Sequence, residues 1–305
     1  MIHSYLIHPG PSPPVGIPLT PTKTKERNCF NNMSNAKTIA ICNQKGGVTK
    51  TTTAVNLGVG LARQGKKVLV VDTDPQADAT TCLGWPEQDK LPITLAGLLD
   101  KSMNDESIAP GEGILHHAEG VDLVPSGIEL SGLELSLVTT MSREFALRDY
   151  LAQVKGGYDY VLIDTMPSLG MLTVNALAAT DSVLIPVQAQ YLSAKGMTQL
   201  VRTISKVRKQ INPALKIDGI LLTLVDVRTN LARDTAAVIR QNYGGVLRIF
   251  KTHIPLAVKA AETSVTGTSI FTHDKNGKAA QAYENLAREV MSIGEPSKNE
   301  PALGR

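Results

Sequence analysis

The chain alternates between short apolar runs and longer segments whose apolar residues recur every three or four positions. Four runs contain almost no charged residue before their last positions: 38–42, 67–72, 158–164 and 219–225. Such runs predict strands that are buried on both faces, as in a parallel sheet. Helical spacing is clearest at 196–211, and helical segments follow most of the runs. Repeated strand–helix units predict an α/β fold with one mostly parallel, twisted sheet and helices on both faces.

The remaining elements are expected at less regular positions. Further strands are expected at 121–125, 183–187 and 246–250. Further helices are expected at 51–64, 128–138, 143–154, 171–179, 231–242 and 279–292. Residues 75–94 and 101–120 are expected to be loops, with a short helix at 95–99 between them. The adjacent His116 and His117 point in different directions on any regular element, so we interpret them as loop residues rather than a metal pair.

Composition narrows the class of protein. The 305 residues are 42% hydrophobic and only 4% aromatic, so the core must consist mainly of Val, Ile, Leu and Ala. The three cysteines have no metal-ligand spacing and indicate a reducing compartment. No apolar run is long enough for a membrane span, and no secretory signal pattern is present, so we expect a cytoplasmic protein.

Both ends of the chain differ in composition from the middle. Residues 1–36 are rich in proline and show no helical or strand period, which predicts a disordered extension, and 294–305 predict a disordered tail. We hypothesise that the native start is Met33, because it lies just before the first strand. The folded domain is expected to cover 37–293.

The segment after the first strand has the pattern of a phosphate-binding loop. Asn43-Gln44-Lys45-Gly46-Gly47-Val48-Thr49-Lys50-Thr51-Thr52 lies between a strand and a helix. In such loops backbone N–H groups and the helix N-terminus bind phosphate oxygens. Lys50 would then reach the β- and γ-phosphates, and the Thr51 hydroxyl would bind Mg²⁺. The general pattern places glycines where this chain has Gln44 and Thr49.

Acidic residues end two further apolar runs. Asp72 and Asp74 follow the second strand, and Asp164 ends the strand at 158–164. Ligands of parallel sheets bind at the carboxyl ends of the strands, so we expect these acids to meet the loop there. A carboxylate in that place can bind a metal or hold an attacking water.

The pattern K-G-G-V-T-K-T from Lys45 to Thr51 resembles the deviant Walker A loop of the ParA/Soj/MinD group of P-loop ATPases, and ParA and Soj most closely. The resemblance extends from about Thr38 to Val290. It implies a P-loop NTPase fold, ATP and Mg²⁺ as cofactors, and a homodimer with ATP sandwiched between the subunits. Lys45 would reach the partner's phosphates. The nucleotide-binding residues would be Lys45, Gly46, Gly47, Val48, Thr49, Lys50, Thr51 and Thr52.

The acids resemble further motifs of the same family. Asp72-Thr73-Asp74-Pro75-Gln76 is similar to its D-x-D-P-Q segment, and Ala77 stands where its following switch loop usually has Gly. This implies that Asp74 positions the attacking water and is catalytic together with Lys45 and Lys50. The Mg²⁺ ligands, partly through water, would be Thr51, Asp72 and Asp164.

Positive charge is concentrated in the C-terminal half. Residues 195–259 contain twelve Lys or Arg and three acids, a local balance of +9 in a chain of net charge +3. Neither interleaved aromatics nor a base-reading motif is visible, which favours sequence-independent contact with nucleic acid phosphates. The family resemblance implies non-specific DNA binding, a nucleoid-associated location and a ParB-like partner that stimulates hydrolysis. The candidate DNA-binding residues are Arg228, Arg202, Lys206 and Lys209.

Two alternatives remain at this point. A MinD-like positioning switch would need a basic amphipathic C-terminal helix, whereas Gly294–Pro301 is polar and contains prolines. A DNA-bound regulator with little ATP turnover remains open because of Thr49: most relatives have Gly there, and a β-branched residue resists the positive φ that Gly permits. We expect either a different loop path or strain there, with slow turnover.

Overall fold

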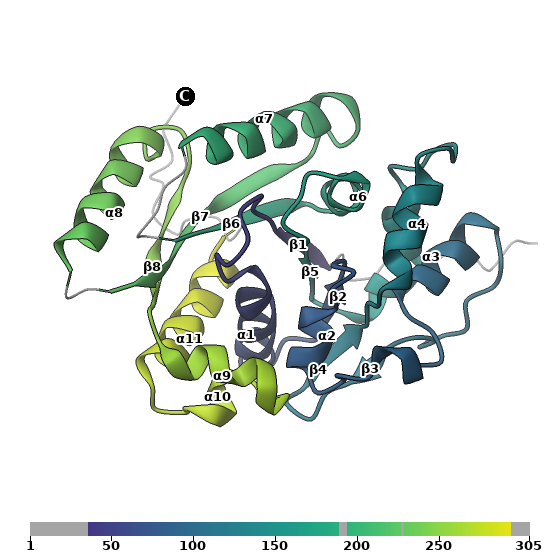
Figure 1. The fold of residues 1–305 in the computed structure, drawn as a ribbon, viewed down its shortest axis with the longest axis horizontal. Coiled ribbons are helices and arrows are strands. Elements are labelled where there is room, and N and C mark those ends of the chain that lie inside the picture. The colour runs from purple at the N-terminus through teal and green to yellow at the C-terminus, as the bar shows by residue number, and fades with distance from the viewer. Residues whose placement is uncertain (1–35, 189–193, 227–228, 294–305) are drawn as a thin grey trace, which may run out of the picture. The chain divides into compact units, whose positions relative to one another are not determined.

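One eight-stranded sheet runs through residues 36–188, 194–226 and 229–293, the part of the chain described by the computed structural model (Figure 1). The strands are β1 (Lys37–Ile41), β2 (Val68–Asp72), β3 (Leu115–His116), β4 (Val121–Val124), β5 (Tyr160–Asp164), β6 (Ser182–Gln188), β7 (Lys216–Val225) and β8 (Ile249–Pro255). Their order is β3-β4-β2-β5-β1-β6-β7-β8, and only the β3–β4 pairing is antiparallel. The expected mostly parallel α/β fold is confirmed.

Helices cover both faces of this sheet (Figure 1). They are α1 (Lys50–Ala62), α2 (Asp78–Cys82), α3 (Leu95–Met103), α4 (Glu129–Leu137), α5 (Ala146–Val154), α6 (Met171–Ala178), α7 (Ala194–Gln210), α8 (Asn230–Tyr243), α9 (Val258–Thr266), α10 (Ile270–His273) and α11 (Lys278–Met291), with 3₁₀ turns η1 (Gln88–Lys90) and η2 (Lys155–Gly157). None of the helices in the described ranges is long and apolar enough to cross a membrane.

The continuous apolar runs are explained by two separate helix layers. In β2, Val68 and Val70 pack in the cluster that includes α1 and α11, whereas Leu69 and Val71 pack with α3 and α5 on the other face. Successive side chains of a strand point to opposite faces, so a strand covered on both sides needs apolar residues at every position.

Several expected connections are wrong. Residues 75–94, expected to be a loop, contain α2 and η1. His116 lies in β3 rather than in a loop, with its Nδ1 2.6 Å from Asp122 Oδ1 on β4. Helices α9 and α10 were not expected at all, because Thr- and Ser-rich segments have modest helical propensity and packing against α1 and α2 decides their structure.

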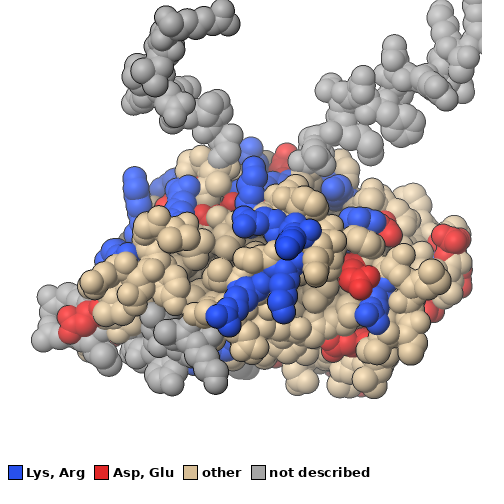
Figure 2. Space-filling model, turned by 90° about the horizontal axis from the view of Figure 1, so that it is seen from above, with Lys and Arg blue, Asp and Glu red and all other residues tan. Residues whose placement is uncertain are grey.

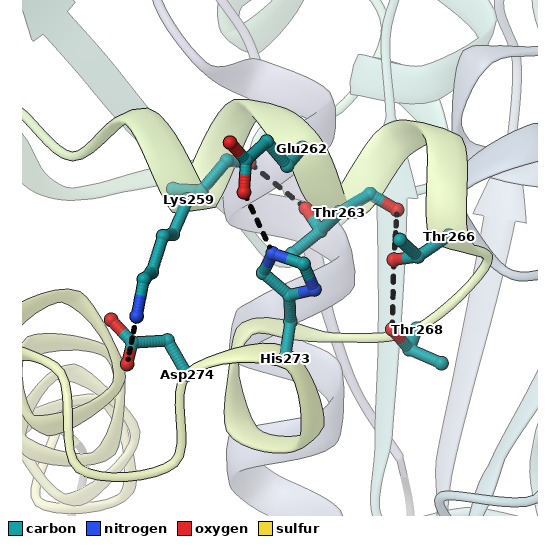
Figure 3. A network of polar contacts seen from close by, with 8 residues as sticks. Lys259, Glu262, Thr263, Thr266, Thr268, His273 and Asp274 are labelled. Carbon is teal, nitrogen blue, oxygen red and sulfur yellow. Dashed lines mark hydrogen bonds and ion pairs between the residues drawn. The ribbon is translucent and has the colours of Figure 1, made fainter.

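Polar contacts join α9 to α10 (Figure 3). Lys259 Nζ lies 3.0 Å from Asp274 Oδ1, and His273 Nε2 lies 2.9 Å from Glu262 Oε2. Lys259 is one of the twelve cations of the basic region, and this ion pair neutralises it locally. Exposed pairs of this kind contribute little stability, roughly 0–1 kcal/mol, so their main effect here is on the surface charge.

The central strands bring the sequence motifs to one edge of the sheet. β2, β5 and β1 are neighbours, and their paired residues include Asp72 with Asp164 and Ile41 with Asp164. The loop from Cys42 to Thr49 follows β1 at that same edge. The expected convergence of the phosphate-loop pattern with the two strand-terminal acids is therefore found.

Candidate nucleotide site

The loop between β1 and α1 is held at its base and open at its tip. Asn43 accepts a hydrogen bond from the Lys45 N–H (3.0 Å) and donates its own amide to the Pro186 carbonyl (2.6 Å), which ties the loop to β6. Gly46 and Gly47 are exposed, and Gly47 has φ +70° with open space where a Cβ would lie. Glycine adopts this conformation without steric cost and leaves the backbone N–H groups accessible to a phosphate.

Lys50 begins α1 and is almost fully buried. Its Nζ lies 3.3 Å from the Lys45 carbonyl oxygen, so the side chain folds back over the loop. Burial lowers the pKa of the Lys50 ammonium, and the nearby Asp164 carboxylate acts in the opposite direction. The lysine is therefore positioned where a phosphate bound in the loop would meet it.

Lys45 points elsewhere. Its Nζ lies 3.1 Å from Gln188 Oε1 at the end of β6, and the residue is partly exposed. The two lysines thus leave the same loop in different directions. Lys50 covers the loop, whereas Lys45 lies beside the end of β6, at the rim of the site.

Thr49 has backbone angles φ 67° and ψ 33°, in the left-handed region, immediately before α1. Of the two outcomes expected for this position, the strained loop is therefore the one observed. Ala77, immediately before α2, has the same conformation at φ 54°. Non-glycine residues in this region cost roughly 1–3 kcal/mol each, so strain lies on both sides of the site.

The two carboxylate oxygens of Asp164 are fully buried and accept no hydrogen bond of good geometry among the described residues, although the Thr51 hydroxyl lies near enough to act on the carboxyl. Burial raises the pKa of this carboxyl well above its usual range, and Asp72 raises it further, while Thr51 and Lys50 lower it. A buried carboxylate without donors is costly unless a cation compensates it. Mg²⁺ prefers oxygen ligands and often takes one or two from the protein, so Asp164 and the Thr51 hydroxyl fit this ion.

Asp72 is equally buried but fully hydrogen-bonded. Its Oδ2 accepts from the Thr80 N–H (2.9 Å) and the Thr80 hydroxyl (2.8 Å), and its Oδ1 accepts from the Asp74 N–H (3.1 Å). Burial raises its pKa to about 7, against these hydrogen bonds, which lower it. Its contacts are those of a residue that holds the following loop.

Asp74 lies in that loop and is nearly buried. Its Oδ1 accepts a hydrogen bond from the Gln76 N–H at 3.0 Å. This Asx turn leaves the second carboxylate oxygen available for a water molecule. The side chain therefore has the geometry of a candidate base or water-positioning group.

The basic candidates are only partly described. Arg202, Lys206 and Lys209 are exposed on α7, opposite the buried Leu200, Ile204 and Val207. No ion pair involves these three cations within the described residues, in contrast to Lys259 with Asp274 and Arg248 with Glu289 (3.5 Å). Figure 2 looks onto the side of the molecule where α7 lies and shows Lys and Arg gathered there. Arg228 lies outside the described residues.

Sequence reasoning missed the residues that hold this site together. Asn43 holds the phosphate loop, and Gln188 contacts Lys45. Thr80 donates to Asp72, and the Ser126 N–H ties the turn after β4 to Thr80. Asn43 begins the phosphate-loop segment, and Thr80 ends the segment that resembles the family's switch loop, but nothing in either pattern indicated which partners these two side chains hold.

A phosphate loop after the first strand of a parallel sheet, with a buried acid at the end of the neighbouring strand, defines a P-loop NTPase. Comparisons with known proteins specify the family. A family model described as "AAA domain" matches residues 36–217. The chain is 43% identical over 258 residues to the sporulation initiation inhibitor protein Soj of Bacillus subtilis, covering 85% of this chain and 99% of that protein.

It is also 40% identical to the chromosome partitioning protein ParA of Caulobacter vibrioides, covering 84% of this chain and 94% of ParA. A solved structure described as a cobyrinic acid a,c-diamide synthase from Mycobacterium smegmatis, with a bound ATP analogue and magnesium, is 37% identical with a TM-score of 0.73, covering 84% of this chain and 94% of that one. The chain belongs to the ParA/Soj family of P-loop ATPases. ATP and Mg²⁺ are accordingly the cofactor pair of this site.

Proposed function

We propose that the protein is a DNA-partitioning ATPase that dimerises with ATP and Mg²⁺, binds DNA without sequence preference, and releases it on hydrolysis stimulated by a ParB-like partner. The observation that carries this proposal is the divergence of the two loop lysines. Lys50 folds over its own loop, while Lys45 extends to Gln188 at the rim. A second lysine at the rim is suited to phosphates that belong to another subunit. Chromosome and plasmid partitioning are the roles that the names of its relatives support.

Within one subunit each residue has a distinct task. The N–H groups of Gly46, Gly47 and Val48 and the start of α1 would bind phosphate oxygens. Lys50 would neutralise charge on the β- and γ-phosphates. Thr51 and Asp164 would hold Mg²⁺, which supplies further neutralisation of the phosphates. Asp74 would hold the attacking water and accept its proton.

The dimer is supported by an apolar surface near the same edge of the sheet. Just before, in and after α4, four large apolar side chains are exposed: Ile128 (63%), Leu135 (76%), Val138 (55%) and Met141 (92%). Residues 102–142 contain no Lys or Arg, which makes a polyanion an unsuitable partner for this surface. An apolar surface is complementary to itself, as a two-fold symmetric dimer requires.

DNA binding is supported by the exposed cations of α7, which form no ion pair with any other residue that the structure describes. Phosphate contacts by Arg202, Lys206 and Lys209 would be sequence-independent and weakened by salt. A protein of this kind would act in the cytoplasm on the nucleoid. Strain at Thr49 and Ala77 supports slow turnover, and the regulator with little turnover is the variant of this function that it favours.

Sedimentation of the protein with a non-hydrolysable ATP analogue and with ADP tests the dimer. We expect a dimer with the analogue and Mg²⁺, a monomer with ADP, and a monomer for Leu135→Glu under both conditions. Val246→Glu is the matched control, because Val246 is 86% exposed and lies between α8 and β8. A wild type that stays monomeric with the analogue refutes the proposal.

The DNA claim has its own measurement. Binding of unrelated DNA duplexes with the ATP analogue should be equal in affinity and should fall steeply with salt. Replacement of Lys206 and Lys209 by Ala should reduce the salt slope by about 2, one for each lost phosphate contact. If no DNA binding is found at low salt, the proposed DNA binding is refuted, but the proposed ATPase activity is not affected by that result.

A further inference from the structure

Thr80 connects three parts of the site that are distant in sequence. It lies in α2, and neither its side chain nor its backbone is exposed. Its hydroxyl donates to Asp72 Oδ2 (2.8 Å) at the end of β2, and its N–H donates to the same oxygen (2.9 Å). The hydroxyl also accepts a hydrogen bond from the Ser126 N–H (3.0 Å), in the turn between β4 and α4. One buried hydroxyl thus joins β2, α2 and the β4–α4 turn.

The segment enclosed by these contacts carries Asp74. Asp72 binds the start of the segment through Oδ1, which accepts from the Asp74 N–H, and its end through Oδ2, which accepts from Thr80. A threonine within a helix commonly donates to a carbonyl oxygen of the preceding turn. Thr80 instead donates to a carboxylate eight residues earlier. Local helix geometry therefore does not account for its hydroxyl.

The contact from the β4–α4 turn uses only the backbone of Ser126. The Ser126 hydroxyl is buried and has no hydrogen-bond partner among the described residues, whereas its N–H donates to Thr80. Any residue with an N–H could supply this bond, so the specificity of the bridge lies in Thr80. Replacing Thr80 by an apolar residue would leave a buried N–H of Ser126 unsatisfied and remove one donor from Asp72.

We propose that Thr80 is a positioning residue for ATP hydrolysis: its hydroxyl, held between Asp72 and the Ser126 N–H, fixes the segment that places the Asp74 carboxylate. The inference rests on the proposed role of Asp74. A misplacement of a catalytic group by about 1 Å can cost on the order of 100-fold in rate. Binding of ATP through the loop and Lys50 does not involve this segment, so the effect falls on kcat rather than on KM.

Steady-state ATPase kinetics of three variants test the proposal. Thr80→Val keeps the shape but removes the hydroxyl, and we expect kcat to fall about 10- to 100-fold with KM for ATP changed less than about threefold. Thr80→Ser restores the hydroxyl, and its kcat should lie within about threefold of wild type. Thr81→Val changes the neighbouring, partly buried threonine of α2 in the same way, and its kcat should not change. If Thr80→Val is insoluble, Thr80→Ala takes its place, with the same expectation.

Two outcomes overturn the inference. One is a Thr80→Val protein with wild-type kcat; the other is a Thr80→Ser protein as impaired as Thr80→Val, which would mean that the methyl packing matters and the hydroxyl does not. Asp74→Asn, measured in parallel, separates the two proposals. An active Asp74→Asn protein refutes the role of Asp74, whereas an inactive one beside a fully active Thr80→Val protein refutes only the role of Thr80.

Discussion

The ends of β2 and β5 carry the same residue type at paired positions, with the same burial and opposite surroundings. Asp72 and Asp164 are partners in the parallel register, and neither is exposed. Asp72 accepts three hydrogen bonds, while neither oxygen of Asp164 accepts a well-formed one among the described residues. A carboxylate whose oxygens are satisfied by the protein can hold a loop, and one whose oxygens accept no well-formed hydrogen bond can hold a cation.

This difference in hydrogen bonding suggests different roles for the two acids, although the sequence analysis gave both the same role. Asp72 and Asp164 were both expected to act at the metal site. The contacts of Asp72 favour a structural task at the segment that carries Asp74, and the metal is better served by Asp164 with Thr51. The two assignments remain predictions, and the following changes separate them, from the largest expected effect to the smallest.

Asp164→Asn should remove most of the ATPase activity, by about 100-fold or more, because loss of a metal ligand forfeits several kcal/mol of transition-state stabilisation. The same change should raise the thermal stability of the protein without nucleotide at neutral pH, because burial raises the pKa of Asp164, so the folded protein must either protonate this carboxyl or bury its charge. Calorimetry and ATPase assays check both signs. A less stable Asp164→Asn protein would contradict the description of Asp164 as unsatisfied.

Asp72→Asn should have the opposite effect on stability. The new amide NH₂ would face the Thr80 and Asp74 donors, and hydrogen bonds to a charged group contribute about 1.5–3 kcal/mol each. We expect the free energy of unfolding to fall by about 2–4 kcal/mol, measured by urea denaturation without nucleotide. Equal changes in the free energy of unfolding for Asp72→Asn and Asp164→Asn would contradict the claim that the two carboxylates differ in their hydrogen bonding.

Removing Mg²⁺ tests the same contrast without altering the fold. With the ATP analogue present, the melting temperature of wild type should be several degrees higher in Mg²⁺ than in EDTA, because a ligand bound only to the folded state stabilises it. In Asp164→Asn this increment should shrink strongly. In Thr80→Ser, whose change lies on the Asp72 side, the increment should persist.

Thr49→Gly should have the smallest effect on stability. Relief of the left-handed strain and the greater freedom of glycine in the unfolded chain oppose each other, so the net change should be about 1 kcal/mol or less. Because the loop relaxes at the site itself, kcat should rise by about fivefold, which corresponds to about 1 kcal/mol. Asp105→Gly is the control: Asp105 has φ 54° at an exposed position in a surface loop. If kcat also rises in Asp105→Gly, the claim that strain at Thr49 slows turnover is refuted.

Local patterns predicted the central sheet well and the peripheral parts poorly. The bounds predicted from the apolar runs at 38–42, 67–72 and 158–164 agree with those of β1, β2 and β5 to within two residues. A strand that is buried on both faces is apolar at nearly every position, so its run is easy to recognise. Helices α9 and α10, and the strand β3 that contains His116, were missed. These elements are short, and contacts with segments distant in sequence decide their structure. Such contacts cannot be predicted from the local spacing of apolar residues.

The sequence by itself determined the central strands with the helices between them, the phosphate loop with its two lysines, and the identity of the acids that follow it, because apolar period and residue chemistry are local properties. Only the tertiary structure decided that Lys50 covers the loop while Lys45 reaches Gln188, and that Thr80 satisfies Asp72 while Asp164 accepts no well-formed hydrogen bond among the described residues. Hydrogen-bond partners of a buried carboxylate come from segments far apart in the chain. Only packing of the whole sheet brings them within about 3 Å.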